Sequence, residues 1–271
     1  MMRLVLGLVD LEAQVNKTMY RLLFGDCLER MKELNDQSID MILCDLPYGV
    51  TVKNKWDIVI PFESLWAEYN RIIKDHGAIV LFAQDKFTAK LMLSNEKMHR
   101  YNLVWKKVLP TGFLNANRMP LREHEDIVVF YKKLPTYNPQ KIKGSPCHSK
   151  GKAIGQMSDD VAQNNNYQNY KCVETIGDMK FPTSVLEFAK PHPSISVHPT
   201  QKPVELLEWL IKTYTNEGDT VLDNCMGSGS TGVACINTNR RFIGIENDLN
   251  YFNIAKDRLE STAHCVQKTV N

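Results

Sequence analysis

The chain has 271 residues, 43% of them hydrophobic and 24% charged, with a net charge of only +2, and this composition is typical of a globular protein. No apolar run approaches a transmembrane span, and the apolar stretch from Leu4 to Val9 is too short for a signal peptide. Seven cysteines without a Cys-x-x-Cys pair or metal-ligand spacing predict reduced thiols in a reducing compartment and no metal site.

The first section of the chain, residues 18–134, alternates predicted strands and helices. Asp26 is a good N-cap for a helix that runs through Leu34, and a second helix is expected around residues 62–73. Strands are predicted at residues 19–24, 39–45, 78–82, 103–105 and 127–131. This alternation predicts a mostly parallel sheet, and a chain of this length has room for one such domain with an insertion.

The most informative motif is Asp45-Leu46-Pro47-Tyr48, which lies at the end of the buried-strand pattern over residues 39–44. A carboxylate at Asp45 can accept a hydrogen bond from an exocyclic amino group, and Tyr48 offers a flat face on which a planar base can stack. Pro47 stiffens the turn and removes one N–H donor. An ordinary exit from a strand is the alternative, because Asp and Pro are common in turns.

From residue 135 to residue 197 the chain becomes rich in Gly, Pro, Asn, Gln and Lys, and its apolar periodicity fades. Residues 132–190 contain nine lysines and five acidic residues, so the modest net charge of the chain hides a basic segment. Clustered Lys and Arg are needed for contacts with phosphates, which favours a DNA-contacting insertion. A solvated polar loop is the alternative interpretation.

The pattern of the first section returns after Val197, with a helix predicted from Pro203 to Tyr214 and another over residues 249–261. Between them, residues 220–232 form a strand, a loop containing Gly227 and Gly229, and the start of a helix. Such a loop presents free N–H groups to a ligand. The following strand ends at Glu246, 17 positions after Gly229, where a carboxylate can reach ribose hydroxyls.

A dinucleotide-binding loop is the obvious competitor for this glycine loop. Asp223 and Asn224 precede the glycines, however, and a pyrophosphate would not favour a negative charge at that place. The loop therefore fits a nucleoside with a cationic or amino-acid tail better than it fits a dinucleotide.

With these motifs in this order, the chain resembles the permuted (beta) class of S-adenosylmethionine-dependent DNA amino-methyltransferases. The resemblance covers nearly the whole chain and rests on four segments: Gly25 to Leu28, Asp45 to Tyr48, His198 to Pro203, and Asp223 to Thr231. Leu46 stands where the family usually has Pro, but the backbone carbonyl of that position is retained. The resemblance implies a Rossmann-like α/β fold: a mostly parallel seven-stranded sheet, helices on both faces, and an inserted target-recognition region.

The resemblance also implies roles for individual residues. Asp45 and a backbone carbonyl of Leu46 or Pro47 would hold the target amine, and Tyr48 would stack on the flipped base. The expected cofactor-binding residues are Asp26 for the adenine, Glu246 for the ribose, Gly227 and Gly229 for the methionine moiety, and Thr200 and Lys202 for the carboxylate. Asp223 is expected in the cofactor site as well. The expected DNA-binding residues are Arg118, Arg122, Lys141, Lys143, Lys150 and Lys152.

The expected domains are residues 1–134 and 198–271, which together form the catalytic domain, and an inserted target-recognition region at residues 135–197. The expected activity is transfer of a methyl group from S-adenosylmethionine to the N6 of an adenine in duplex DNA, because Asp at the first motif position is commoner for adenine in this family and Ser for cytosine. Three alternatives are cytosine-N4 methylation, methylation of a protein glutamine, and a DNA-binding regulator without turnover. A cytoplasmic, prokaryotic or phage-encoded protein is expected, and the resemblance leaves open a homodimer and a companion restriction endonuclease.

Overall fold

The computed structural model describes residues 19–49, 58–145, 177–190 and 201–270. The chain divides into two compact units. The larger comprises Met1–Asn138 and Ser184–Asn271, and the smaller comprises Pro139–Thr183. Within the described part of the chain, no helix is long and apolar enough to cross a membrane.

The larger unit is built on one eight-stranded sheet with the order β1-β10-β9-β2-β3-β5-β4-β8. Only β5 runs antiparallel to its neighbours, β3 and β4. The strands are β1 (Tyr20–Phe24), β2 (Ile39–Asp45), β3 (Ile73–Ala83), β4 (His99–Thr111), β5 (Arg122–Phe130), β8 (Val185–Phe188), β9 (Thr220–Asp223) and β10 (Arg241–Glu246).

The mostly parallel sheet is confirmed, but the expectation of seven strands is wrong. The additional strand is β8, a four-residue edge strand that pairs in parallel with β4. Its sequence lies within the polar segment assigned to the insertion, and only Leu186 among its residues is fully buried. A strand this short and this exposed carries no clear alternation of apolar residues.

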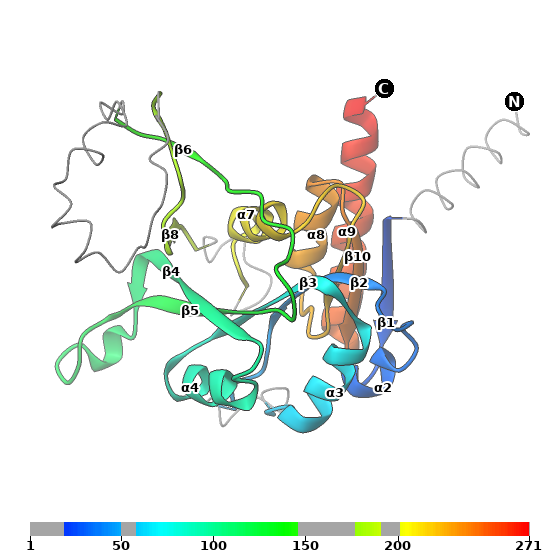
Figure 1. Ribbon diagram of the computed structural model, residues 1–271, viewed down its shortest axis with the longest axis horizontal. Coiled ribbons are helices and arrows are strands. Elements are labelled where there is room, and N and C mark those ends of the chain that lie inside the picture. The colour runs from blue at the N-terminus through cyan, green and yellow to red at the C-terminus, as the bar shows by residue number, and fades with distance from the viewer. Residues whose placement is uncertain (1–18, 50–57, 146–176, 191–200, 271) are drawn as a thin grey trace, which may run out of the picture. The chain divides into compact units, whose positions relative to one another are not determined.

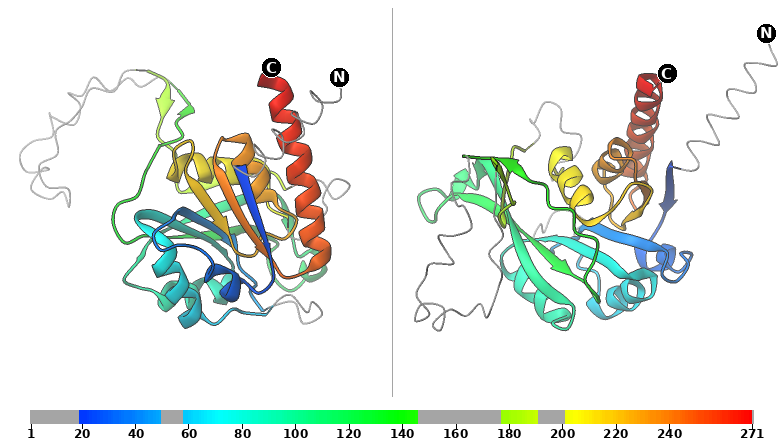
Figure 2. Two further views of the ribbon diagram at one scale, coloured as in Figure 1. Left: turned by 90° about the vertical axis from the view of Figure 1, so that its right-hand side faces the viewer. Right: turned by 45° about the horizontal axis from the view of Figure 1, so that its top comes forward.

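In the described part of the larger unit, six helices cover the sheet, three on each face (Figure 1). One face packs against α2 (Cys27–Met31), α3 (Phe62–Ile72) and α4 (Asp85–Ser94), and the other against α7 (Val204–Tyr214), α8 (Ser230–Asn237) and α9 (Leu249–Val270). The further views in Figure 2 show the same division of the helices. All but α4 were expected; this helix buries only Phe87, Thr88 and Leu91, so its periodicity is weak.

Strands are added to the sheet in opposite directions from β2 and from β9, which are adjacent and parallel. From β2 the chain continues through α3 to β3 on one face, whereas from β9 it continues through α8 to β10 on the other face. The carboxyl ends of β2 and β9 therefore flank a topological switch point, the place where open α/β sheets bind their ligands. A short 3-10 helix, η1 (Phe113–Asn115), lies in the connection between β4 and β5.

In the smaller unit, the described residues contain two short strands, β6 (Ile142–Lys143) and β7 (Met179–Lys180), which pair antiparallel. The ammonium group of Lys141 lies 4.6 Å from the centroid of the Phe181 ring. This unit, residues 139–183, is shorter than the expected insertion at residues 135–197, because β8 belongs to the main sheet.

Candidate active site

Strand alternation brings the polar residues of the central strands to one face of the sheet. Successive side chains of a strand point to opposite faces. Asp45 follows Met41 and Leu43, which belong to the core under α7, and therefore points to the same face. Phe82 on β3 and Trp105 on β4 are buried in that core as well. Asp45 is paired with Phe82 on the neighbouring strand, and Trp105 is paired with Glu125 of β5. The four side chains therefore lie towards the same end of these strands.

Both carboxylate oxygens of Asp45 have hydrogen-bond partners. The hydroxyl group of Tyr48 donates to Oδ1 at 2.6 Å, and the ammonium group of Lys202 donates to Oδ2 at 2.6 Å. Burial, together with the neighbouring Asp45, raises the pKa of Tyr48, so the hydroxyl remains protonated and able to donate. The Asp45 side chain is therefore held at both oxygens, while one quarter of it stays exposed.

Behind Asp45, buried charges of alternating sign continue across the sheet. The ammonium group of Lys202 also lies 3.1 Å from Oε2 of Glu125, and Lys107 pairs with Oε1 of Glu125 at 2.5 Å. The side chains of Lys107 and Lys202 are only 2% and 9% exposed. We call Asp45, Lys202, Glu125 and Lys107 the ion chain.

Electrostatic attraction outweighs desolvation within the ion chain. Burial alone would raise the pKa of Glu125, but the charges of Lys202 and Lys107 lower it to about 2. Burial alone would lower the pKa of Lys202, but the charges of Asp45 and Glu125 raise it. Lys202 and Glu125 are therefore ionised at neutral pH. The Lys202 ammonium also lies 4.9 Å from the centroid of the Phe82 ring, where a cation–π attraction adds to the ion pairs.

The other residues of the Asp45 motif form the wall of this edge. Leu46 is buried, and its side chain packs in the core on the α3 face. The ring of Tyr48 lies against Phe87 of α4, with centroids 4.9 Å apart and an interplanar angle of 33°. Phe87 thus supports one face of the Tyr48 ring in the orientation that its hydroxyl bond to Asp45 also favours.

On the other side of the switch point, Glu246 at the end of β10 is held by backbone N–H groups. Its Oε2 accepts from Gly227 at 2.8 Å, and its Oε1 accepts from Asn247 and Asp248, both at 2.9 Å. Burial raises the pKa of Glu246, and these backbone hydrogen bonds limit the rise. Glu246 therefore links the glycine loop to the end of its strand.

Asp223 at the end of β9 is fully buried and bonded within its own loop. The hydroxyl group of Thr231 donates to Oδ2 at 2.6 Å, and the backbone N–H of Cys225 donates to Oδ1 at 3.1 Å. Burial raises the pKa of Asp223 to about 6, although both hydrogen bonds oppose the rise. Asp223 therefore joins the end of the strand to the first turn of α8.

The two glycines of the loop are required for different physical reasons. Gly227 has φ of +52°, which favours glycine in the turn. Gly229 has φ of +78°, and a Cβ there would lie 2.9 Å from Leu259 and 3.0 Å from Ala255 of α9. Gly229 is therefore required for close packing between the loop and α9, a role that the ligand-centred interpretation of the sequence did not foresee.

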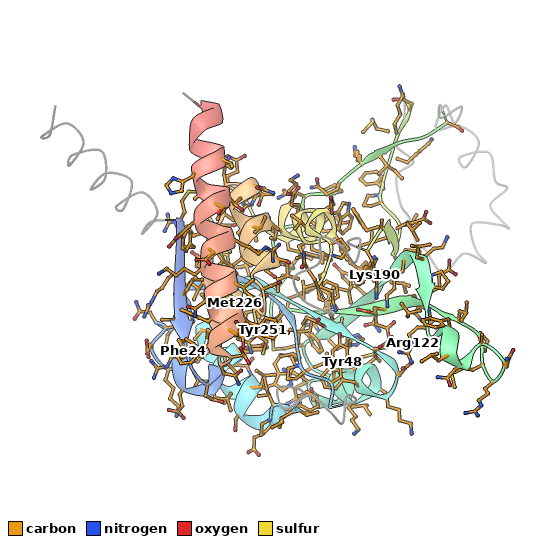
Figure 3. All side chains as sticks on the ribbon, turned by 180° about the vertical axis from the view of Figure 1, so that it is seen from behind. Phe24, Tyr48, Arg122, Lys190, Met226 and Tyr251 are labelled. Carbon is orange, nitrogen blue, oxygen red and sulfur yellow. The ribbon has the colours of Figure 1, made fainter. Side chains whose placement is uncertain are left out.

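Asp26 follows β1 and caps α2, as expected. Its Oδ1 accepts from the backbone N–H groups of Leu28 at 2.9 Å and Glu29 at 3.2 Å. The backbone N–H of Gly25 donates to the carbonyl of Glu246 at 2.9 Å, so the ends of β1 and β10 are tied together. In Figure 3, Phe24, Met226 and Tyr251 mark this side of the site, and Tyr48, Lys190 and Arg122 mark the other.

The structure thus brings the expected residues of the larger unit to the carboxyl ends of two groups of strands. Asp26, Asp223, Gly227, Gly229 and Glu246 lie at the ends of β1, β9 and β10, which we call the glycine-loop half. Asp45 to Tyr48 lie at the end of β2, which with β3, β5 and β4 forms the Asp45 half. Lys202, assigned from the sequence to the cofactor's carboxylate, is bonded to Asp45 and Glu125.

The expected DNA-binding residues are exposed where the structure describes them. Arg118 and Arg122 lie in or beside the β4–β5 connection, and Arg122 pairs with Asp85 at 2.9 Å. In the smaller unit, Lys141 and Lys143 are exposed, and Lys143 lies 3.6 Å from Asp178. Thr200, Lys150 and Lys152 lie outside the described residues.

Sequence reasoning missed Glu125 and Lys107. Neither residue was among the expected site residues. A signal was present, because Glu125 stands two positions before Ile127 and Lys107 two positions after Trp105, which places both on apolar strand faces. Two opposite charges on buried faces predict a buried ion pair once the strands are known to be neighbours.

Comparisons with known proteins show the family of this chain and agree with its fold. A family model described as DNA methylase matches residues 39–257. Type II methyltransferase M.HpaI of Haemophilus parainfluenzae is 30% identical over 255 residues, covering 89% of this chain and 74% of the relative. DNA adenine methyltransferase YhdJ of Escherichia coli (strain K12) is 28% identical over 260 residues, covering 90% of this chain and 83% of the relative.

Among solved structures, the crystal structure of the M1.HpyAVI–SAM complex is similar to this fold with a TM-score of 0.59 and 26% sequence identity. The likeness covers 89% of this chain and all of that chain, 100% of its length. The family model spans the Asp45 motif, the ion chain and the glycine loop together. The chain belongs to the DNA methylase family.

Proposed function

We propose that the protein transfers a methyl group from S-adenosylmethionine to the exocyclic N6 of an adenine flipped out of duplex DNA, at a specific sequence. The observation that carries this proposal is the placement of Asp45, oriented at both oxygens, beside a glycine loop across the switch point. An acceptor for an amine and a loop for a nucleoside ligand thus lie at neighbouring strand ends. A relative of this chain is named as a DNA adenine methyltransferase.

The residues of the glycine-loop half fit the cofactor. Glu246 presents a carboxylate at the end of β10, a suitable acceptor for two ribose hydroxyls, and the turn at Gly227 lets a ligand approach the backbone. Asp26 would accept from the adenine amino group, and the backbone of Gly227 and Gly229 would line the methionine moiety. When bound, S-adenosylmethionine supplies an electrophilic methyl group on a sulfonium.

The Asp45 half fits the target amine, a weak nucleophile because its lone pair is delocalised into the base. The Asp45 carboxylate and the backbone carbonyl of Leu46 would each accept one amino hydrogen and draw the nitrogen towards tetrahedral geometry. The lone pair then points towards the methyl group. Such orientation of reacting groups accounts for large rate effects, and no covalent bond to the enzyme is needed.

The base must leave the helix to reach this site, because its amino group is inaccessible inside a duplex. Tyr48 would stack on the flipped base while Phe87 supports its ring from within the protein. The decisive experiment is nucleoside analysis by mass spectrometry after incubation of unmethylated duplex DNA with the protein and cofactor. N6-methyladenine is expected; N4-methylcytosine alone would contradict the adenine assignment, and an unmodified DNA would contradict the activity.

We further propose that six basic residues contact DNA phosphates. These are Arg118, Arg122, Lys141 and Lys143, which are exposed, and Lys150 and Lys152, which lie outside the described residues. Replacement of the four lysines by Gln should lower the slope of log affinity against log salt by about 0.9 for each lost phosphate contact. Lys32→Gln, at the residue that follows α2, serves as the control. An unchanged slope in the fourfold variant would mean that the segment is a solvated loop without phosphate contacts.

The partner of this activity is duplex DNA. We propose a cytoplasmic location in a prokaryotic or phage-infected cell, and a companion restriction endonuclease and a homodimer are the further partners to be tested. Size-exclusion chromatography with light scattering tests the dimer. Resistance of the host DNA to cleavage at the methylated sequence tests the endonuclease.

A further inference from the structure

Lys202 is bonded in a way that the proposed function does not explain. It lies two residues before the start of α7, and its ammonium group lies within 3.1 Å of two carboxylates, one from β2 and one from β5. The faces of Phe82 and Trp105 lie 4.9 and 6.0 Å from the same nitrogen. A buried ammonium with these neighbours is held in one place.

The Asp45 carboxylate has a fixed orientation because of this contact. Tyr48 holds Oδ1 from one side and Lys202 holds Oδ2 from the other. A carboxylate has about four lone-pair positions, so these two hydrogen bonds leave acceptor capacity for an amine. Rotation of the carboxylate would break at least one of the two bonds, so the remaining lone pairs keep a constant direction.

Lys202 is itself positioned by the rest of the ion chain. The ammonium group of Lys202 makes its second contact with Oε2 of Glu125. The ammonium group of Lys107 lies 2.5 Å from the other carboxylate oxygen of Glu125, Oε1, and so fixes that side chain. Trp105, which packs beside both lysines, donates from its indole N–H to the carbonyl of Phe188 at 2.9 Å. A movement of Lys202 towards another ligand would leave Asp45 and Glu125 without a partner, which is costly for buried charges.

We propose that Lys202, fixed by Glu125 and Lys107, is the positioning residue that aims the Asp45 carboxylate at the target amine, and that it is not a ligand of the cofactor. This inference rests on the proposed function. It assigns Glu125 and Lys107 a role in the methyl-transfer step, although neither touches the reacting atoms. It predicts a loss of rate without a loss of affinity when Lys202 is removed.

The test is Lys202→Met, measured as single-turnover methyl transfer at saturating cofactor and DNA, with both affinities measured by titration. The rate is expected to fall by about 10²-fold, the size of effect that a misplaced reacting group produces, while both affinities stay within about twofold. Lys202→Arg should recover part of the rate. Lys212→Met, which removes an exposed lysine of α7 paired with Glu208, should behave as wild type.

A loss of cofactor affinity in Lys202→Met with a normal rate at saturation would overturn the inference and make Lys202 a cofactor ligand. An unchanged rate would overturn it as well. If Lys202→Met does not fold, Lys202→Arg and Glu125→Gln carry the test, with smaller losses of the same kind expected. A wild-type protein that methylates no DNA overturns both the proposed function and this inference, whereas an active wild type with an unaffected variant overturns the inference alone.

A double-mutant cycle separates positioning from a general structural effect. In the Asp45→Asn background, Lys202→Met should lower the remaining rate little further, because a residue that acts through Asp45 has nothing left to position. Losses that multiply in the double variant would show that Lys202 acts independently of Asp45, and would contradict the proposal.

Discussion

The glycine-loop half and the Asp45 half hold their carboxylates by different means. Glu246 and Asp223 accept hydrogen bonds from backbone N–H groups and a hydroxyl, whereas Asp45 and Glu125 are paired with buried lysines. Desolvation prevails in the first case, where the pKa of Asp223 rises to about 6. Ion pairing prevails in the second, where the pKa of Glu125 falls to about 2.

This difference shows which residues each half depends on. A backbone N–H is present at every position except proline, so the glycine-loop half depends mainly on the backbone path at its strand ends. The Asp45 half depends on side chains from four separate segments, and loss of one leaves another buried charge unpaired. The glycine-loop half should therefore respond to substitution mainly in ligand binding, and the Asp45 half in catalysis and stability.

The sharpest test of the comparison is Asp45→Ala. Methyl transfer should fall by at least about 10²-fold, because the target amine loses the acceptor that orients it. Cofactor affinity, measured by calorimetric titration, should persist, because Asp45 lies in the other half of the site. Normal turnover by this variant would remove Asp45 from the mechanism.

Loss of Lys107 tests the cost of breaking the ion chain. Lys107→Met should destabilise the fold by about 3 kcal/mol in urea unfolding, because it removes one of the two cations that balance the buried Glu125. The matched control is Lys133→Met, which breaks an exposed pair with Asp75 and should leave the unfolding midpoint nearly unchanged. Equal effects in the two variants would mean that burial of the pair has no energetic consequence.

In the glycine-loop half, Glu246→Ala should act on the ligand. Cofactor affinity should fall by about tenfold or more, since a hydrogen bond to a charged group contributes roughly 1.5–3 kcal/mol. Calorimetry measures this, with the exposed Glu63→Ala as control. Cofactor affinity equal to that of wild type would show that the ribose is bound elsewhere.

The smallest expected effect is the pH dependence of Asp223→Asn. The folded-state pKa of Asp223, about 6, lies above its unfolded value near 3.8, so the folded state binds the proton more tightly. This contribution to stability is full below about pH 4 and is lost as the pH rises through about 6. Asp223→Asn should therefore gain about 1 kcal/mol more stability at pH 8 than at pH 5, measured by urea unfolding of the cofactor-free protein. An equal change in the free energy of unfolding at both pH values would contradict the raised pKa of Asp223.

The two halves also differ in how much of them the sequence reveals. Two motifs are contiguous in sequence and lie at strand ends: Asp223 to Thr231 and Asp45 to Tyr48. Local sequence patterns therefore predicted both motifs and the strands and helices around them. The ion chain was missed because its members come from β2, β4, β5 and the segment that leads into α7, and their proximity depends on the antiparallel position of β5. Local pattern cannot give the order of strands in a sheet.

A similar limit explains why seven strands were expected in the sheet and not eight. β8 is only four residues long, and two of these residues are exposed, so its pairing with β4 depends on the neighbouring strand more than on its own sequence. The role of Gly229 has the same origin, because Leu259 and Ala255 of α9 occupy the space a side chain would need. Both features depend on contacts between segments distant in sequence.

The points where the chain leaves and re-enters the main sheet have a consequence for protein engineering. Asn138 donates to the carbonyls of Thr213 and Thr215, and the carbonyl of Ser184 accepts from Val104 at 2.8 Å. These anchors belong to the larger unit, so residues 139–183 begin and end at fixed points of the catalytic framework. That segment is consequently a candidate for exchange as one block, and its exchange between relatives would test whether it carries the sequence preference.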